Sequence, residues 1–328
     1  MPSPSALDQW AIEQTNVAAE YFDDPGCMYD WQIELFTRES KQTIPIVQRL
    51  LSGEIDASTA ASEANRLCEA RLRRDERKET PQGLWLVLCM AIEHFADDSG
   101  DETSSTRAKL AALIVELSKI ELRDDSGDII LSHEGKKEFW SELPGWVLSF
   151  CDLLTGLPDR GSLLDETGFM VGWQRRFQGG NLFQAHWLAH VGPVAGPPLA
   201  YRYAIAQGLE YMREALETKP EESPLGRRHS ERYTAGVLPW IWEAGVKVLE
   251  LCRAEHRRDG SKVFSRTHSC EGFTGYTFTG DDGYHMERWG VWKGAYRRVA
   301  ATQGIRPEVA ERAAATAEEM DRLDLEYE

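Results

Sequence analysis

Several hallmarks of common protein classes are missing from this sequence of 328 residues. It has no run of about 18 consecutive apolar residues, so no transmembrane helix is expected. Its first residues, MPSPSALDQWAIEQ, lack the basic and apolar stretches of a secretory signal peptide. We therefore expect an intracellular, cytoplasmic protein with no membrane span.

Cofactor-binding and metal-binding motifs are also missing. The six cysteines are far apart, with no CxxC pair and no close Cys/His cluster, so a structural zinc site is not expected. There is no GxxxxGK[ST] phosphate loop, no GxGxxG that opens a helix after a strand, and no GxSxG nucleophile elbow. The sequence therefore gives no support for a nucleotide cofactor, and we predict that the protein uses no cofactor.

Positive charge is in short supply. The chain has 37 Lys and Arg against 54 Asp and Glu, which gives a formal net charge of −17. Such a surface repels the phosphates of nucleic acids and of anionic membranes, so no nucleic-acid partner is expected. With 42% hydrophobic and 28% charged residues, the chain has the composition of a globular protein with a large core.

The sequence lacks the regular alternation of strands and helices that marks Rossmann and barrel folds. Apolar residues instead recur at three- and four-residue steps along most of the chain, which is the period of a helix face. We predict an all-α fold, a compact bundle of roughly ten to twelve helices in a single domain over residues 1–328. At most a short hairpin is expected near 261–280. Flexible loops are expected near 97–106, 123–128 and 218–226.

The clearest single element is the stretch 283–300, GYHMERWGVWKGAYRRVA. It predicts an amphipathic helix with a buried aromatic face, on which Asp281 or Asp282 caps the first turn and Arg288 lies over an aromatic ring or in solvent. The face consists of Met286, Trp289, Trp292, Tyr296 and Val299.

Charged residues on the predicted helix 199–217 are spaced three apart. Glu210 with Arg213 and Glu214 with Glu217 form two such pairs, and this spacing is typical of a solvated helix face. We expect all four side chains at the surface.

Two histidines offer the best candidates for chemistry. His186 and His190 are spaced i, i+4 in the predicted short helix NLFQAHWLAHV, so both imidazoles can face one point. Such a pair can bind a metal, act as an acid, base or hydrogen-bond donor in a pocket, or be structural. A metal needs at least one more ligand, and HWLAH lacks the glutamate of HExxH. We predict no metal and take both histidines as candidate catalytic residues.

Aromatic residues are frequent in the second half of the chain. Their composition is typical of an apolar small-molecule pocket, although packing between helices is the favoured explanation. A site is expected where the helix 283–300 meets the histidine helix. The candidate substrate-binding residues are Trp173, Trp187, Tyr203, Trp240, Trp289 and Trp292.

Several stretches resemble a fungal family of all-helical proteins known only as a domain of unknown function and often encoded in secondary-metabolite gene clusters. The most specific is the Glu-Arg-Trp … Trp-Lys pattern at 287–293, preceded by a glycine-rich approach at 272–282. The Leu-Pro-Gly segment at 143–145, the helix at 204–217 and the run LLSGEI at 50–55 are also similar. The resemblance implies an all-helical fold and brings no assigned activity.

Together these observations suggest a cofactor-independent enzyme of fungal secondary metabolism. We expect a cyclase or isomerase, with a pericyclase such as a Diels–Alderase as one specific form, acting on an apolar terpenoid or polyketide intermediate. The alternatives are a non-catalytic interaction or scaffold protein and a small-molecule carrier. The expected partner is thus an apolar small molecule, and a homo-oligomer is left open.

Overall fold

The computed structural model describes residues 4–21, 30–74, 80–95, 101–131, 138–155, 168–192, 198–220, 224–256, 273–276, 278 and 282–327. The chain divides into two compact units, the first made of residues 1–156 and 191–201 and the second of residues 157–190 and 202–328. Each unit is described by itself. The single domain over 1–328 stays a prediction.

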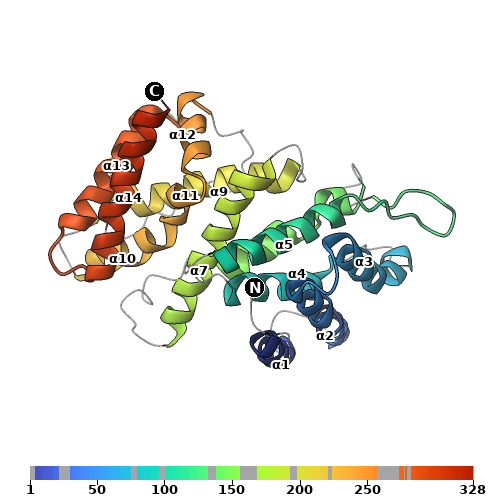
Figure 1. Ribbon diagram of the computed structural model, residues 1–328. Coiled ribbons are helices and arrows are strands. Elements are labelled where there is room, and N and C mark those ends of the chain that lie inside the picture. Colours follow the sequence, from blue (N-terminus) through green and yellow to red (C-terminus); the bar gives the residue numbers. More distant parts are fainter. Residues whose placement is uncertain are drawn as a thin grey trace. The chain divides into compact units, whose positions relative to one another are not determined.

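The described chain is built almost entirely of helices, so the predicted all-α class is confirmed (Figure 1). Unit 1 contains α1 (Pro4–Tyr21), α2 (Asp30–Ser52), α3 (Ala57–Arg74), α4 (Gln82–His94), α5 (Asp101–Ser118), η1 (Trp140–Glu142), α6 (Trp146–Phe150) and η2 (Cys151–Thr155). Unit 2 contains α7 (Gly168–His186), η4 (Trp187–Val191), α9 (Pro198–Leu216), α10 (Pro224–Val237), α11 (Pro239–Trp242), α12 (Gly245–Arg253), α13 (Met286–Ala301) and α14 (Pro307–Glu326), except that α9 begins and η4 ends in unit 1.

Two short strands accompany the helices of unit 2. Strand β1 (Thr218–Pro220) pairs antiparallel with β2 (Phe273–Tyr276). Strand β2 lies inside the stretch 261–280, where a hairpin was expected at most, but its partner precedes α10. The pair therefore joins two distant segments and is no local hairpin.

The three expected loops have different outcomes. In 97–106, α5 already begins at Asp101, and residues 97–100 lie outside the described residues. Segment 123–128 is an ordered turn, closed by a bridge between Arg123 and Ile129. Segment 218–226 contains β1 and the start of α10, and residues 221–223 lie outside the described residues.

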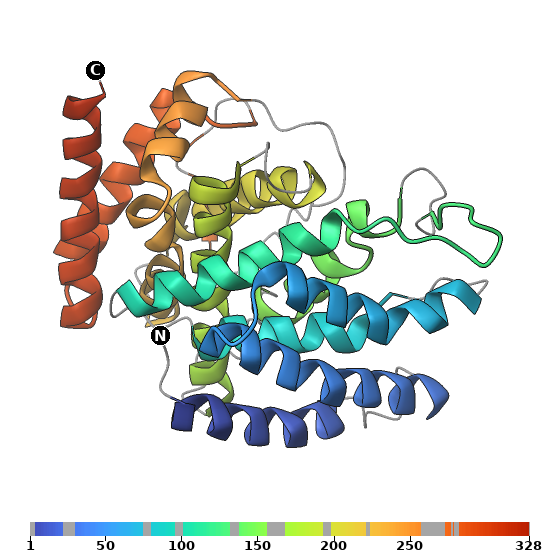
Figure 2. The same cartoon turned by 45° about the vertical axis from the view of Figure 1, so that its right-hand side comes forward.

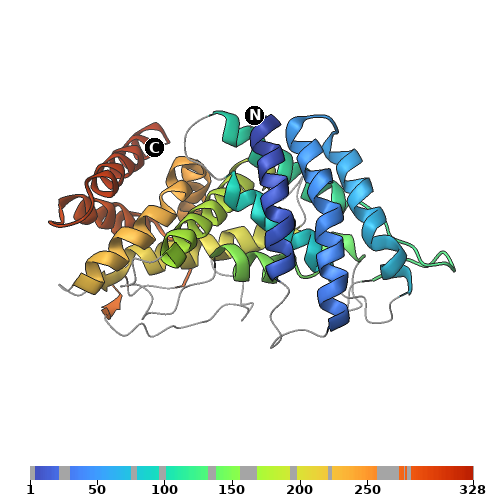
Figure 3. The same cartoon turned by 90° about the horizontal axis from the view of Figure 1, so that it is seen from below.

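Helix α4 is the centre of unit 1. It is apolar almost all round, as the run GLWLVLCMAIEH suggests, and its ten residues from Gly83 to Ile92 are all buried. Helices α1, α2, α5 and α6 all contact it. Figure 3 shows α1, α2 and α3 side by side in blue, in agreement with the contacts of α2 with both neighbours.

Helices α2 and α4 approach very closely at Gly83. A Cβ atom on this residue would lie 2.5 Å from the carbonyl oxygen of Phe36 and 2.8 Å from the backbone nitrogen of Ser40. The buried carboxylate of Glu39 uses the same approach, since its Oε2 accepts the N–H of Gly83 at 3.0 Å. A side chain from α2 thus caps the first turn of α4.

Substitution of Gly83 by alanine is expected to lower the free energy of unfolding by about 2–3 kcal/mol, because the added methyl group collides with backbone atoms that cannot move alone. Gly290→Ala is the matched control. A Cβ at Gly290 meets nothing within 4 Å, and helix propensity favours alanine by up to about 1 kcal/mol. Urea unfolding followed by circular dichroism measures both variants. Equal changes in the two would contradict the close approach of α2 and α4.

In unit 2, α13 and α14 lie side by side, as the red ribbons of Figures 1 and 2 show. The buried face of α13 holds Trp289, Trp292, Tyr296 and Val299, which confirms the predicted aromatic face. Met286 is 41% exposed and does not belong to that face. The predicted cap is wrong: His285 is the N-cap residue, without a side-chain hydrogen bond.

A buried ion pair holds the start of α13 to the end of α9. Arg288 and Glu217 are 2% and 0% exposed, with Nε of the arginine 2.8 Å from Oε1 of the glutamate. The Arg288 guanidinium also lies 4.1 Å from the centre of the Phe278 ring. The expected surface position of Glu217 is therefore wrong, because α13 packs over this end of α9. That of Glu214 is wrong as well, since this residue is 7% exposed.

Among the described residues, no helix combines the length and the apolar character needed to cross a membrane.

Candidate functional site

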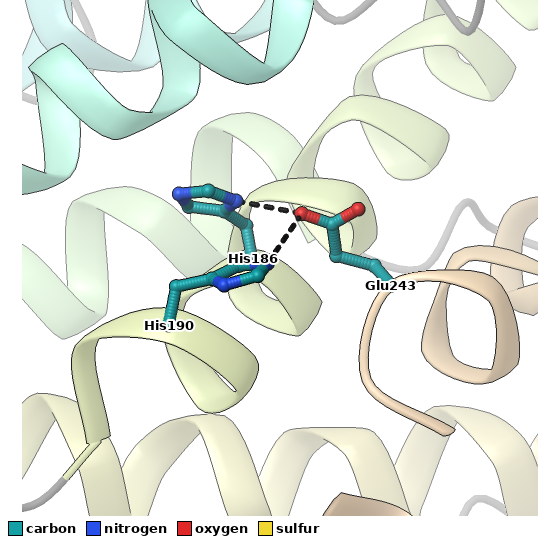
Figure 4. Close-up of side chains that lie close together, drawn as sticks. All are labelled: His186, His190 and Glu243. Atoms are coloured by element: carbon teal, nitrogen blue, oxygen red, sulfur yellow. Dashed lines mark hydrogen bonds and ion pairs between the residues drawn. The ribbon is translucent and has the colours of Figure 1, made fainter. Parts of the chain in front are cut away.

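The two candidate histidines meet a third side chain within unit 2. His186 ends α7, and His190 lies one π-turn further on, in η4. The third residue is Glu243, at the corner between α11 and α12, and α11 contacts α7. Figure 4 shows both imidazole rings turned towards one oxygen of the Glu243 carboxylate.

The helical turn between His186 and His190 brings the two rings close together. It is a π-turn, whose hydrogen bonds span five residues, and residues four apart lie nearly above one another in it, as they do in an α-helix. The ring centres of His186 and His190 are 4.6 Å apart, with the planes inclined at 42°. Single π-turns of this kind are frequent at functional sites.

The position of Glu243 follows from the two short helices around it. Proline opens α11 at Pro239, and this single turn ends at Glu243, whose N–H donates to the Pro239 carbonyl at 2.8 Å. Helix α12 then begins at Gly245. Glu243 therefore lies at a corner of the chain, and its side chain extends towards α7.

The distances within this cluster are unequal. Nδ1 of His186 is 2.6 Å from Oε1 of Glu243, the length of a strong charge-assisted hydrogen bond, whereas Nε2 of His190 is 3.4 Å from the same oxygen. The side chain of His186 is 7% exposed, that of Glu243 18% and that of His190 58%. The cluster therefore has a buried end at His186 and an accessible end at His190.

Hydrogen-bond chemistry assigns the proton on His186. An ionised carboxylate can only accept, so Nδ1 of His186 must carry the hydrogen in the bond to Glu243. The other nitrogen of this ring, Nε2, then points away from the carboxylate, as Figure 4 shows. Glu243 thus fixes both the orientation and the tautomer of His186.

The same three residues have the geometry of a metal-ligand set. One ligand atom from each of His186, His190 and Glu243 lies within 4.8 Å of the other two. Two imidazoles and one carboxylate are the ligands of many catalytic zinc and non-haem iron sites. The sequence argument against a metal was the lack of a third ligand, and the fold supplies one.

The predicted substrate-binding residues whose side chains are described lie in the core of unit 2. Trp187, Tyr203, Trp240, Trp289 and Trp292 are all buried, with at most 6% exposure. The side chain of Trp173 lies outside the described residues. Of the predicted substrate-binding residues, Trp187 is next to His186 in the chain, and it packs on Phe183 with ring centres 6.1 Å apart.

Three of these tryptophans bond their indole N–H to buried or half-buried polar groups. Trp240 donates to Asn181 Oδ1 at 2.6 Å, Trp289 to Asp324 Oδ1 at 2.8 Å and Trp292 to Glu217 Oε1 at 2.8 Å. Each bond joins two segments of unit 2 that are at least 35 residues apart in the sequence. This favours helix packing over the lining of a pocket for these three residues.

Sequence reasoning missed Glu243. The signal was present, because this glutamate is the one charged residue in the apolar run AGVLPWIWEAGV at 235–246. An isolated carboxylate in such a run needs a partner if it is buried. The pattern does not say which partner, and the site was instead expected beside the helix 283–300.

A comparison with family models identifies the family of this chain. Residues 85–296 match the model described as "Protein of unknown function (DUF3632)". The chain belongs to the DUF3632 family. No curated protein and no solved structure matches the chain.

The DUF3632 match covers all three residues of the site, from His186 to Glu243, and also the ion pair between Glu217 and Arg288. It begins at Trp85 in α4 and ends at Tyr296 in α13. The resemblance found in the sequence segments 143–145, 204–217 and 287–293 agrees with this match.

Proposed function

We propose that this DUF3632 protein is an enzyme that cyclises or isomerises an apolar terpenoid or polyketide intermediate without a nucleotide cofactor. The observation that carries the proposal is the convergence of His186, His190 and Glu243 on one point, with His190 more than half exposed. The resemblance to a fungal family often encoded in secondary-metabolite gene clusters is the reason for naming these two substrate classes. A pericyclase such as a Diels–Alderase is one specific form of the proposal.

The accessible end of the cluster suits a substrate carbonyl. At 3.4 Å, the contact of His190 Nε2 with Glu243 is too long for a strong hydrogen bond, so this N–H can turn to a substrate oxygen. A hydrogen bond there draws electron density from a conjugated carbonyl and stabilises the charge that develops in the transition state. The hydrogen bond between His186 and Glu243 keeps the Glu243 carboxylate in place beside His190.

An exposed aromatic residue directly precedes Glu243 in the chain. Trp242 is 53% exposed although it is a large aromatic residue, and its indole N–H donates to Thr316 Oγ1 at 2.9 Å. The bond fixes an exposed aromatic ring one residue before Glu243.

The proposal is tested with a panel of polyketide and terpenoid intermediates that carry an α,β-unsaturated carbonyl, with products followed by liquid chromatography and mass spectrometry. The expected product has the mass of its substrate. His186→Ala/His190→Ala is expected to slow its formation by about 100-fold or more, because both imidazoles are gone. His256→Ala, which removes a histidine outside the cluster, is the control and is expected to leave the rate unchanged.

Unchanged turnover in the folded double variant would contradict the assignment of the site. A product that differs in mass from its substrate would contradict the reaction class. Binding of panel compounds without any conversion would favour the carrier alternative. Circular dichroism of both variants shows whether the fold is kept.

A further inference from the structure

We propose that His186, His190 and Glu243 bind one first-row transition-metal dication, with Zn²⁺ as the best fit. Binding rests on the geometry alone. A role for the metal in polarising the substrate carbonyl, in place of the N–H of His190, rests in addition on the proposed function.

The two histidine–carboxylate distances leave room for the ion after a small adjustment. With metal–ligand bonds of about 2.0–2.1 Å and tetrahedral angles, neighbouring ligand atoms are about 3.3–3.4 Å apart. Nε2 of His190 is already 3.4 Å from Oε1 of Glu243. Nδ1 of His186 is 2.6 Å from the same oxygen, so this pair must separate by about 0.7 Å, which a small side-chain rotation achieves. A ligating nitrogen carries no hydrogen, so metal binding also moves the proton of His186 from Nδ1 to Nε2 of the same ring.

The arrangement of two imidazoles around one oxygen is more than an ion pair requires. One imidazole, that of His186, is sufficient to hydrogen-bond Glu243. The second ring comes from the next turn of the same helix and is aimed at the same oxygen atom. A divalent cation at this point satisfies all three groups at once, whereas two protonated imidazoles 4.6 Å apart would repel each other.

The ligand atoms select the class of metal. Two nitrogens and one carboxylate oxygen suit zinc and its neighbours, whereas Mg²⁺ and Ca²⁺ prefer all-oxygen sites. Three protein ligands leave at least one coordination position open, as in catalytic zinc sites. Because His190 is 58% exposed, the ion can enter from that side.

The test titrates chelator-treated, dialysed protein with ZnCl₂ in an isothermal titration calorimeter, and with CoCl₂ while the visible absorption is recorded. One equivalent of Zn²⁺ is expected to bind to the wild type, and Co²⁺ is expected to give the intense bands of a four- or five-coordinate ion. Excess Mg²⁺ is expected to leave the Zn²⁺ affinity unchanged.

Two variants remove a single ligand each. His190→Ala and Glu243→Gln are expected to weaken Zn²⁺ binding by at least about 100-fold, since even the loss of a residue that only supports a ligand costs 10–100-fold. His190 is mostly exposed, so its removal is compatible with folding. The matched controls are His256→Ala and Glu250→Gln, a surface carboxylate on α12 that pairs with Lys247, and both are expected to bind like the wild type.

Absence of saturable Zn²⁺ binding to the wild type would overturn the metal site, and so would wild-type affinity in both ligand variants. Because no substrate is present, these results do not depend on the proposed function. If the histidine variants lose turnover but the wild type binds no metal, the proposed function is supported and the metal site is excluded. If the protein binds Zn²⁺ but its turnover is unchanged by a chelator, the metal site is confirmed and a catalytic role of the metal is excluded.

Discussion

Replacement of Arg288 by methionine is expected to lower the free energy of unfolding by about 3–5 kcal/mol, because the Glu217 carboxylate keeps its buried position without the guanidinium beside it. Both side chains are at most 2% exposed, and Nε of Arg288 is 2.8 Å from Oε1 of Glu217. The same oxygen accepts the indole N–H of Trp292 at 2.8 Å. Urea unfolding followed by circular dichroism gives the free energy.

The ion pair between Arg288 and Glu217 is also connected to the segment before α13. Arg288 donates to the carbonyl of Gly283, and Arg213 bonds Asp282 Oδ1 at 2.9 Å while its Nε lies 3.9 Å from Glu217 Oε2. The segment before α13 is thereby tied to α9. The loss of Arg288 therefore loosens this segment as well as the ion pair.

Two controls separate buried charge from lost packing. The double variant Glu217→Met/Arg288→Met is expected to be more stable than Arg288→Met, because it removes the buried carboxylate that has lost the Arg288 guanidinium and fills the space with apolar atoms. Arg322→Met, which breaks an exposed pairing with Glu319 and Glu326, is expected to cost about 1 kcal/mol or less. An Arg288→Met variant as stable as Arg322→Met would contradict the buried ion pair.

The pH dependence of Arg288→Met has a defined sign. Burial raises the pKa of Glu217, and the charge of Arg288 opposes that rise. Without the guanidinium the pKa rises further, so the folded state binds a proton more tightly than the unfolded state. The variant is therefore expected to regain stability as the pH falls below the folded-state pKa of Glu217, and to lose it as the pH rises through that value. Unfolding at a series of pH values measures this.

Replacement of Trp85 by alanine is expected to lower the free energy of unfolding by about 3–5 kcal/mol, because it leaves a cavity in the core of unit 1. Trp85 has no exposed surface, and its ring packs edge-on against Trp146 and Trp140, with centres 5.3 Å and 6.1 Å away. Its indole N–H donates to the carbonyl of Pro144 at 2.8 Å.

The bond from Trp85 depends on the turn that presents Pro144. Leu143 and Gly145 both have positive φ angles, 47° and 80°, and a Cβ on Gly145 would lie 2.8 Å from Thr80 Cβ. The Leu-Pro-Gly segment noted in the sequence is therefore a tight turn packed against the start of α4. This gives a structural reason for one of the segments that carry the family resemblance.

Trp85→Phe is the matched variant. It keeps an aromatic ring and removes the N–H, so a loss of about 1–2 kcal/mol is expected. Thermal unfolding of the wild type and both variants, followed by circular dichroism, gives the order wild type, Trp85→Phe, Trp85→Ala. Equal losses in the two variants would show that the hydrogen bond to Pro144, and not the filled volume, carries the effect.

The candidate site was only half predictable from the sequence. His186 and His190 stand four residues apart, so their common direction follows from helix geometry. Glu243 is 57 residues away from His186, and it meets the two histidines only once α11 packs on α7. The prediction of no metal depended on this missing residue. The described tryptophans of the prediction are buried, but burial alone does not distinguish a residue that packs helices together from one that lines a pocket.

The helical class and the buried faces of single helices such as α13 could be predicted from residue spacing, because periodicity is a local property and the burial of Trp289, Trp292 and Tyr296 follows from it. Which charged groups are buried and which of them meet depends on the packing of distant segments. Glu217 has the spacing of a surface residue yet lies under α13 against Arg288, and Glu243 finds two histidines on another helix. The physical reason is that desolvation and ion pairing depend on distances between segments, which the spacing within one segment does not contain.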